Sequence, residues 1–257
     1  MGVQRIALVD PVDEWLMQRI QRCCRQFKIE TILLPSPMFL NSTQELKQFF
    51  KASKSKFFQT EFYKQQRQSR NILLDAAGSP IGGQWTFDVD NRKKYPKGKA
   101  IAKVELPTVD AYALEAQNYT ARNFAHNIGD LDEGLRYPIG FEASERWLAQ
   151  FLKHRLAEFG DYEDAIVRKE LLLNHSLLTP MLNVGLLTPA MVIEQTLHHS
   201  QLHNIPINSL EGFVRQIIGW REFIRGVYLA KGTAERTRNY WGFTRKIPPS
   251  FYNGTTG

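Results

Sequence analysis

The sequence has 257 residues, of which 43% are hydrophobic and 23% are charged, so the chain can bury the core of one large or two ordinary domains. Its formal net charge of +7 permits a polyanionic partner without requiring one. No apolar run approaches the ~20 residues that cross a bilayer, and no secretory leader precedes Arg5, so we expect a cytoplasmic protein without a membrane partner. The adjacent Cys23 and Cys24 suit neither a disulfide framework nor a zinc knuckle.

The start of the chain predicts one strand–helix–strand unit. The apolar runs Arg5–Val9 and Glu30–Leu34 predict strands, and Asp10-Pro11 predicts a cap for a helix that continues to about Phe27. Two strands connected in this way are parallel, and parallel sheets usually have further strands and are covered on both faces. The sequence offers no clear third strand, so we expect the chain to begin inside an α/β domain whose earlier strands are missing.

An aromatic-rich helical region follows, to about Arg70. Asn41-Ser42-Thr43 predicts its start, with Glu45 completing a capping box. Phenylalanines alternate with lysines and arginines here, which indicates either base stacking with phosphate contacts or an amphipathic helix with aromatics in the core. Helical spacing of the aromatics favours the core interpretation.

A loop and a connector separate this region from the second half. Gly, Pro and polar residues predict a loop over residues 78–99, with Trp85 and Phe87 as anchors on a neighbouring surface. Residues 100–136 predict a connector with some helix near Val109–Phe124. A helix is then predicted from Phe141 to Gly160, and everything after it is helical in pattern, so the chain changes class near residue 140.

Two Thr-Pro pairs dominate the second half. Thr179-Pro180 and Thr188-Pro189 each predict a helix start, with a hydroxyl cap and Pro in the first turn, and Gly185 predicts a left-handed end between them. A third helix, capped by Asn208 or Ser209, is predicted to run over about 210–230 with a length of ~30 Å at ~1.5 Å per residue. Helix starts with free amides and hydroxyls bind anions, so a phosphate group is a candidate ligand.

Three stretches carry a family resemblance. HSLLTPMLNVGLLTP (175–189) resembles the flavin-pyrophosphate segment of the photolyase/cryptochrome superfamily, and Trp220-Arg221-Glu222-Phe223 stands where that superfamily has Trp-Arg-Glu-Phe. EGFVRQIIGWREFIRGVY (211–228) resembles the prokaryotic iron–sulfur branch, which includes bacterial (6-4) photolyases, and Gly-Gly-Gln-Trp-Thr-Phe-Asp-x-x-Asn-Arg (82–92) is similar to a signature of that branch. The resemblance covers nearly the whole chain.

The resemblance implies an architecture. Residues 1–75 would be the end of an α/β photolyase-related domain, 76–140 an interdomain connector, and 141–257 the first part of an all-α FAD-binding domain. The fold class is thus an α/β remnant followed by an incomplete all-α domain, an internal fragment of a monomeric protein about twice as long. Three further features would lie outside this chain: the lesion-contacting histidines, the ligands of a possible ribolumazine antenna and the cysteines of a 4Fe-4S cluster. The cluster cysteines would lie beyond Gly257.

The resemblance also implies cofactor contacts. An FAD would be held by the following residues: Tyr162, His175, Ser176, Leu177, Leu178, Thr179 and Gln216. Tyr162 has an equal alternative, a core position against Trp147, and His175 stands where the commoner pattern has Thr. No catalytic side chain is predicted in this chain. No metal site is predicted either, because His199 and His203 lack an evident third ligand.

Together with a local excess of basic residues, the resemblance implies a surface that binds ultraviolet-damaged DNA. Its residues are Trp220, Arg221, Arg225, Arg236 and Arg238. A solvated charged face is the alternative for the arginines, and a core position is the alternative for Trp220.

The implied function is light-driven repair of pyrimidine photoproducts, of (6-4) type, by an electron from reduced FAD to a flipped-out lesion. One alternative is a cryptochrome-like blue-light photoreceptor without repair, and another is an inactive truncated fragment. We expect residues 1–257 alone to bind flavin weakly or not at all.

Overall fold

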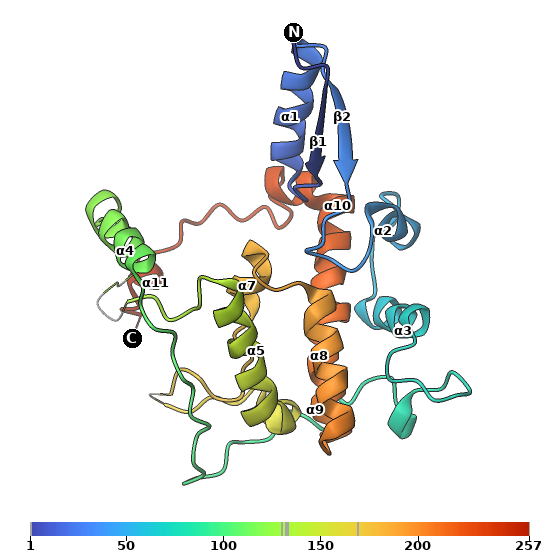
Figure 1. Ribbon diagram of the computed structural model, residues 1–257, viewed down its shortest axis with the longest axis vertical. Coiled ribbons are helices and arrows are strands. Elements are labelled where there is room, and N and C mark those ends of the chain that lie inside the picture. The colour runs from blue at the N-terminus through green and yellow to red at the C-terminus, as the bar shows by residue number, and fades with distance from the viewer. Residues whose placement is uncertain (1, 130, 132–133, 169, 257) are drawn as a thin grey trace.

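The computed structural model describes residues 2–129, 131, 134–168 and 170–256 (Figure 1). About half of these residues are helical, and a two-stranded parallel sheet is the only sheet among them. The strands and one helix project from one end of a helical body (Figure 1). Gly257 lies outside the described residues.

The predicted strand–helix–strand unit is confirmed. β1 (Arg5–Val9) pairs in parallel with β2 (Glu30–Leu34), in a register that sets Arg5 opposite Glu30, and α1 (Glu14–Gln26) connects them. The predicted cap is wrong, since Asp13, not Asp10, accepts a hydrogen bond from the helix, at 2.7 Å from the Leu16 N–H. The Asp10 carboxylate instead accepts from the backbone N–H of Val12, which closes a turn before the helix begins.

The next helices pack against the C-terminal half rather than on the sheet. α2 (Thr43–Phe49) begins with the predicted Ser42–Glu45 capping box, and a break over residues 50–58 separates it from α3 (Gln59–Arg70). Phe50 and Phe62 are buried against Phe223, with ring centroids 5.4 and 6.0 Å from that ring. The core interpretation is therefore confirmed for Phe50 and Phe62, whose burial excludes base stacking, whereas Phe58 is exposed.

The loop after α3 is ordered. It contains a single 3₁₀ turn, η1 (Ile81–Gly83), and buries Phe87 and Asn91. The fully buried Arg67 donates hydrogen bonds to the carbonyl oxygens of Trp85, at 2.8 Å, and Ile72, at 3.3 Å. Farther along, α4 (Ala111–Asn123) lies where the connector predicted some helix.

The helix predicted from Phe141 to Gly160 is shorter than expected. α5 (Phe141–His154) ends at Arg155, whose φ of −130° leaves the helical region, and η2 (Leu156–Glu158) and α6 (Phe159–Tyr162) follow as separate turns. The buried face of α5, which includes Trp147 and Phe151, forms one side of the main hydrophobic core. The break lets Leu156 and Phe159 enter that same core.

Both Thr-Pro pairs begin helices. α7 (Thr179–Val184) ends at Gly185, whose φ is +80°, and α8 (Pro189–Leu202) is capped by the Thr188 hydroxyl, which accepts from the Met191 N–H at 3.3 Å. Thr179 differs from the prediction: it is the first helical residue, and its hydroxyl caps nothing.

One long helical run follows, residues 207–237, which we call the long helix. It consists of α9 (Ile207–Val214), the π-helical segment η3 (Arg215–Arg221) and α10 (Glu222–Thr237). Asn208 and Ser209 do not cap it, because the helix starts at Ile207 after Pro206. The short α11 (Pro249–Asn253) closes the described chain. None of the described helices has the length and apolar character needed to cross a membrane.

Candidate functional site

The π-helical segment η3 is the centre of the candidate site. A π-helix bonds i to i+5 and so has wide turns, and such turns are frequent at functional sites. Here Gly219 lets α3 approach closely, because a Cβ at this position would lie 2.8 Å from Gln59 Nε2 and 3.2 Å from Tyr63 Cδ2. The segment carries Gln216 and Arg221, which belong to the two predicted sets of site residues.

Arg215 stands at the centre of a buried polar cluster, the Arg215 cluster. Its guanidinium Nη2 lies 3.2 Å from Asp88 Oδ1 and 3.7 Å from Glu163 Oε1, and its Nε lies 3.2 Å from Glu211 Oε1. The Arg215 and Glu163 side chains are only 8% and 11% exposed, and Glu211 is fully buried. One cation thus faces three carboxylates. The cluster therefore connects the end of α6 and the loop Gly82–Arg92, which we call the signature loop, to the long helix.

Two of the cluster's carboxylates have further partners. Glu211 Oε2 accepts from the Phe87 N–H at 2.9 Å, which fixes the signature loop. Glu163 accepts from Asn91 Nδ2 at 3.1 Å and from Gln216 Nε2 at 3.3 Å. Burial raises the pKa of Glu163, and the positive charge of Arg215 acts in the opposite direction.

The segment before α7 is a turn with free donors. Leu177 has a φ of +59°, an uncommon value for a residue with a side chain, and Leu178 follows in the α region. Trp147 Nε1 donates to the Ser176 carbonyl oxygen at 3.2 Å and holds the turn against α5. Within the described part of the chain, the backbone N–H groups of residues 175–178 and the hydroxyls of Ser176 and Thr179 donate no hydrogen bond.

Arg221 connects this turn's helix to the long helix. Its Nη1 donates to Asn183 Oδ1 at 2.9 Å and its Nη2 to the Leu182 carbonyl oxygen at 3.2 Å, both at the end of α7. Its guanidinium also lies 4.8 Å from the centroid of the Phe39 ring. The two long motifs of the sequence, at 175–189 and 211–228, therefore meet in space.

The next two polar side chains of the long helix face inward. Glu222 is fully buried and accepts from the backbone N–H groups of Leu40 and Asn41 at 2.8 and 3.0 Å. Arg225, 6% exposed, donates to the Asn41 carbonyl oxygen and, at 3.4 Å, to Thr43 Oγ1. This removes Arg225 from the residues available to a DNA phosphate, since its guanidinium holds the segment between the sheet and α2.

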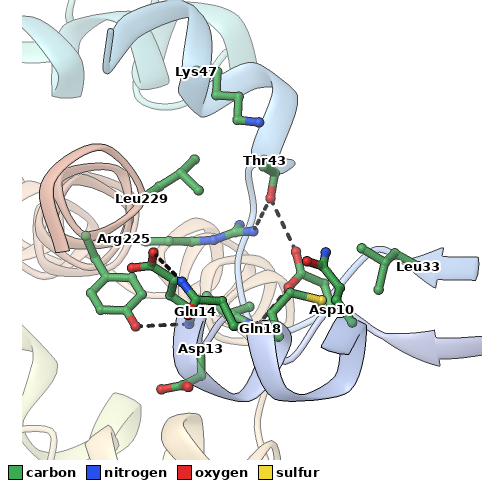
Figure 2. A pocket seen from close by; sticks show the side chains of 13 residues that line it. Asp10, Asp13, Glu14, Gln18, Leu33, Thr43, Lys47, Arg225 and Leu229 are labelled. Atoms are coloured by element: carbon green, nitrogen blue, oxygen red, sulfur yellow. Dashed lines mark hydrogen bonds between the residues drawn. The ribbon is translucent and has the colours of Figure 1, made fainter. Parts of the chain in front are cut away.

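A pocket of about 430 Å³ lies at the carboxyl ends of β1 and β2, between α1 and the long helix (Figure 2). Acidic Asp10 and Glu14 face basic Lys47 and Arg225 across it, and the Glu14 N–H donates to the Tyr228 hydroxyl at 3.1 Å. None of the residues predicted to hold FAD lines this pocket, so the pocket and the turn at 175–178 are separate features.

Comparison with known proteins identifies the family. Residues 1–135, just over half of the chain, match the family model described as "Deoxyribodipyrimidine photo-lyase-related protein". The chain belongs to the deoxyribodipyrimidine photolyase-related family. The matched range of this photolyase-related chain contains the Gly82–Arg92 signature loop, whose Asp88 and Asn91 enter the Arg215 cluster.

A curated relative extends the likeness over the second half. The "(6-4) photolyase" of Agrobacterium fabrum is 29% identical over 252 residues, which cover 98% of this chain and 49% of that protein. This photolyase-related chain thus spans about half the length of that relative. Two uncharacterized proteins of Acanthamoeba polyphaga mimivirus are 35% and 34% identical over 99 and 98 residues, 37% of this chain in each case and 74% and 50% of the viral proteins.

The other predicted site residues lie in different settings. Tyr162 is buried with its ring 4.9 Å from that of Tyr95, so it packs on the signature-loop side. His175 is exposed, Leu178 is buried and Gln216 is half-buried. The structure therefore brings Gln216 to the Arg215 cluster through Glu163, while Tyr162 packs on Tyr95, and His175 and Thr179 lie at the turn over residues 175–178.

The predicted DNA-binding residues of this photolyase-related chain differ in how exposed they are. Trp220 is 41% exposed and meets Phe223 edge to face, at 6.0 Å between centroids. Arg236 is exposed but stacks 4.0 Å over the Trp15 ring, and Arg238 is exposed at the end of α10. Trp220, Arg236 and Arg238 are thus exposed, whereas Arg221 is half-buried and Arg225 is buried.

Metal ligands were not predicted for this chain. His199 and His203 stack on each other at 4.2 Å between ring centroids, and no described group of three or more potential ligands gathers in space. The chain has two cysteines, Cys23 exposed and Cys24 buried, and they are adjacent. These residues do not fit a four-cysteine iron–sulfur cluster.

Proposed function

We propose that this chain is part of a light-driven flavoprotein that repairs (6-4) pyrimidine photoproducts in DNA, and that it contributes the site for the FAD pyrophosphate. The family and the (6-4) photolyase relative, aligned over 98% of the chain, support this function. When bound, reduced FAD supplies the photoexcited electron for the repair chemistry. The chain's own residues bind and orient that cofactor and the DNA.

The free-donor turn carries the flavin part of the proposal. Successive backbone N–H groups around a positive φ form a concave anion site, and a diphosphate accepts from several donors at once. The turn at 175–178 has such N–H groups without a protein acceptor, and the Ser176 and Thr179 hydroxyls add two donors. The fixed Ser176 carbonyl orients the turn before any ligand binds, because Trp147 holds it.

The DNA part of the proposal is supported by charge and exposure. Of the cationic residues between 211 and 246, Arg215 and Arg225 are buried, whereas Arg236, Arg238, Arg245 and Lys246 are exposed, as is Trp220. Such a surface binds phosphates non-specifically through counterion release. An iron–sulfur cluster and a ribolumazine antenna would belong to parts of the longer protein that this chain does not contain.

Two measurements on the purified longer protein that contains this chain test the proposal. FAD binding is followed by flavin fluorescence for the wild type and for Ser176→Ala/Thr179→Val, which removes both free hydroxyls; the affinity should fall at least tenfold. Blue light is then applied to the reduced, FAD-loaded protein with an oligonucleotide containing one (6-4) photoproduct. Loss of the photoproduct supports repair, whereas flavin photochemistry without repair favours the cryptochrome-like alternative. Unchanged FAD binding in the double variant contradicts the proposed pyrophosphate site.

A further inference from the structure

The hydrogen bond between Glu163 and Gln216 joins a carboxylate, which only accepts, to an amide, which has one donating and one accepting end. Gln216 Nε2 lies 3.3 Å from Glu163 Oε2. An ionised carboxylate only accepts hydrogen bonds, whereas an amide has an NH₂ end that donates and a carbonyl end that accepts. The amide must therefore turn its NH₂ toward Glu163, because the reverse orientation would set two acceptor oxygens against each other.

Glu163 is itself held in place. Its other oxygen, Oε1, accepts from Asn91 Nδ2 at 3.1 Å, and Arg215 Nη2 lies 3.7 Å from the same atom. Asn91 is packed between two glycines, since a Cβ on Gly160 would lie 2.8 Å from its Oδ1 and a Cβ on Gly212 would lie 3.2 Å from its Nδ2. The carboxylate is thus fixed before any ligand binds.

The far end of the Gln216 amide has no partner in the protein. Among the described residues, none donates a hydrogen bond to Gln216 Oε1, and the side chain is half-buried on the wide turns of η3. The orientation set by Glu163 therefore leaves a carbonyl oxygen as the group that Gln216 presents. An acceptor in that place selects ligands that carry an N–H or O–H donor.

We propose that Glu163 is a positioning residue that fixes the Gln216 amide as a hydrogen-bond acceptor for an imide N–H group of the ligand. This rests on the proposed function, in which Gln216 contacts the cofactor site. Isoalloxazine rings and pyrimidine bases both contain an imide N–H, so the chemistry is shared by flavin and photoproduct. Glu163 acts through Gln216 and need not touch either of them.

The first test reads the amide orientation without any ligand. Side-chain amide resonances of Gln216 are identified by their loss in Gln216→Leu and compared in the wild type, Glu163→Gln and the control Asp164→Asn, which removes a neighbouring exposed carboxylate. We expect one Gln216 amide proton to be shifted downfield and protected from solvent exchange in the wild type and Asp164→Asn, but not in Glu163→Gln. Identical resonances in all three proteins would overturn the proposal.

The second test measures ligand preference. FAD and N3-methyl-FAD report on the flavin imide, and an oligonucleotide with one (6-4) photoproduct reports on the pyrimidine imide. For whichever probe contacts Gln216, affinity should fall about tenfold in Glu163→Gln, where the amide can reverse. For the flavin, methylation of N3 should remove this difference. Equal affinity of wild type and Glu163→Gln for both imide probes would overturn the proposal.

A rescue variant separates positioning from folding. Glu163→Gln/Gln216→Glu restores an amide–carboxylate hydrogen bond, and Glu at 216 can present only acceptors, so imide binding should return toward the wild-type affinity. Gln216→Glu alone sets two carboxylates together and should bind poorly. Failure of the double variant to recover, while it remains folded by circular dichroism, contradicts the positioning role. If the wild type binds neither imide probe, the proposed function fails, and the amide resonances still decide the orientation set by Glu163.

Discussion

Arg221 Nη1 donates a hydrogen bond of 2.9 Å to Asn183 Oδ1, which links the Trp-Arg-Glu-Phe motif to the end of the helix begun by Thr179-Pro180. A second hydrogen bond, from Nη2 to the Leu182 carbonyl oxygen, gives Arg221 two contacts with the end of α7. Desolvation lowers the pKa of Arg221, and the charge of Glu222 counteracts it. Arg221 thus has a structural role in addition to any contact with DNA.

A double-mutant cycle on Arg221 and Asn183 measures this tie. Arg221→Ala should reduce the free energy of unfolding by about 1.5–3 kcal/mol, because the hydrogen bonds from a charged donor to Asn183, Leu182 and Met38 are lost. Asn183→Ala should cost less, since the bond to Leu182 remains. Urea denaturation of both single variants and the double variant should give a coupling of about 1 kcal/mol. Strict additivity would mean that the 2.9 Å contact contributes nothing to stability.

Arg155 is expected to destabilise the fold. It is 1% exposed, and none of its guanidinium nitrogens has a hydrogen-bond partner among the described residues. Burial lowers the pKa of Arg155 to about 10. Arg155→Met keeps the volume and removes the buried charge, so thermal and urea denaturation should show a gain of about 1–3 kcal/mol at neutral pH.

The pH dependence of this gain has a definite sign. Between pH 10 and the higher, ordinary pKa of arginine, the folded state binds fewer protons than the unfolded state, so wild-type stability rises with pH there and the advantage of the Met variant shrinks. Arg146→Met, an exposed arginine on the same helix, is the control and should change little. A loss of stability in Arg155→Met would contradict this prediction and show that the contact of the cation with the Phe151 ring, 5.6 Å away, or the packing around it outweighs the cost of burying the charge.

Gly226 is required by the Phe50 ring. A Cβ on Gly226 would lie 2.1 to 2.6 Å from three atoms of that ring, and Phe50 is itself enclosed by Phe49, Phe57 and Phe62. Gly226→Ala should therefore cost about 1–3 kcal/mol through overpacking, although alanine is the better helix former by about 1 kcal/mol. In a Phe50→Ala background the same substitution should become neutral or stabilising. An equal cost in both backgrounds would exclude the Phe50 clash as its cause.

Because of Glu163, the free energy of unfolding should fall as the pH rises just above 4.5, the ordinary pKa of glutamate. Its pKa is raised first by burial and also by Asp164 and Asp88, against the lowering effects of Arg215 and Asn91. The folded state then binds more protons than the unfolded state in that window, so deprotonation favours unfolding. Denaturation curves of wild type and Glu163→Gln across this window should differ in slope. Parallel pH profiles would mean that the Glu163 pKa is the same in both states.

Local patterns predicted the elements whose ends are set by neighbouring residues. Both strands occupy the predicted residues, and the Ser42–Glu45 capping box uses atoms within one helical turn. Helix ends set by distant contacts were missed. Ser209 was predicted as a cap, but its hydroxyl donates to the Ala157 carbonyl oxygen and accepts from the Gly160 N–H, both at 2.9 Å. No spacing rule reveals such a partner.

The same distinction applies to the candidate site. The motif around Ser176 is visible in the sequence, whereas the role of Glu163 depends on Gln216, 53 residues later, and Asn91, 72 residues earlier. One part was readable: Glu211 and Arg215 have the i,i+4 spacing of a helical ion pair. Their burial and their contact with the signature loop come from tertiary packing.

The wide turns of η3 make the length of this stretch as important as its composition. Each α-helical residue advances the helix by about 100°, so deleting one residue between Arg215 and Arg221 would let ordinary α turns form and rotate everything downstream. Phe223 would leave the ring cluster of Phe50 and Phe62, and Glu222 would turn away from the amides of Leu40 and Asn41. Homologous chains with this architecture should therefore tolerate exchange of side chains here far better than a gap.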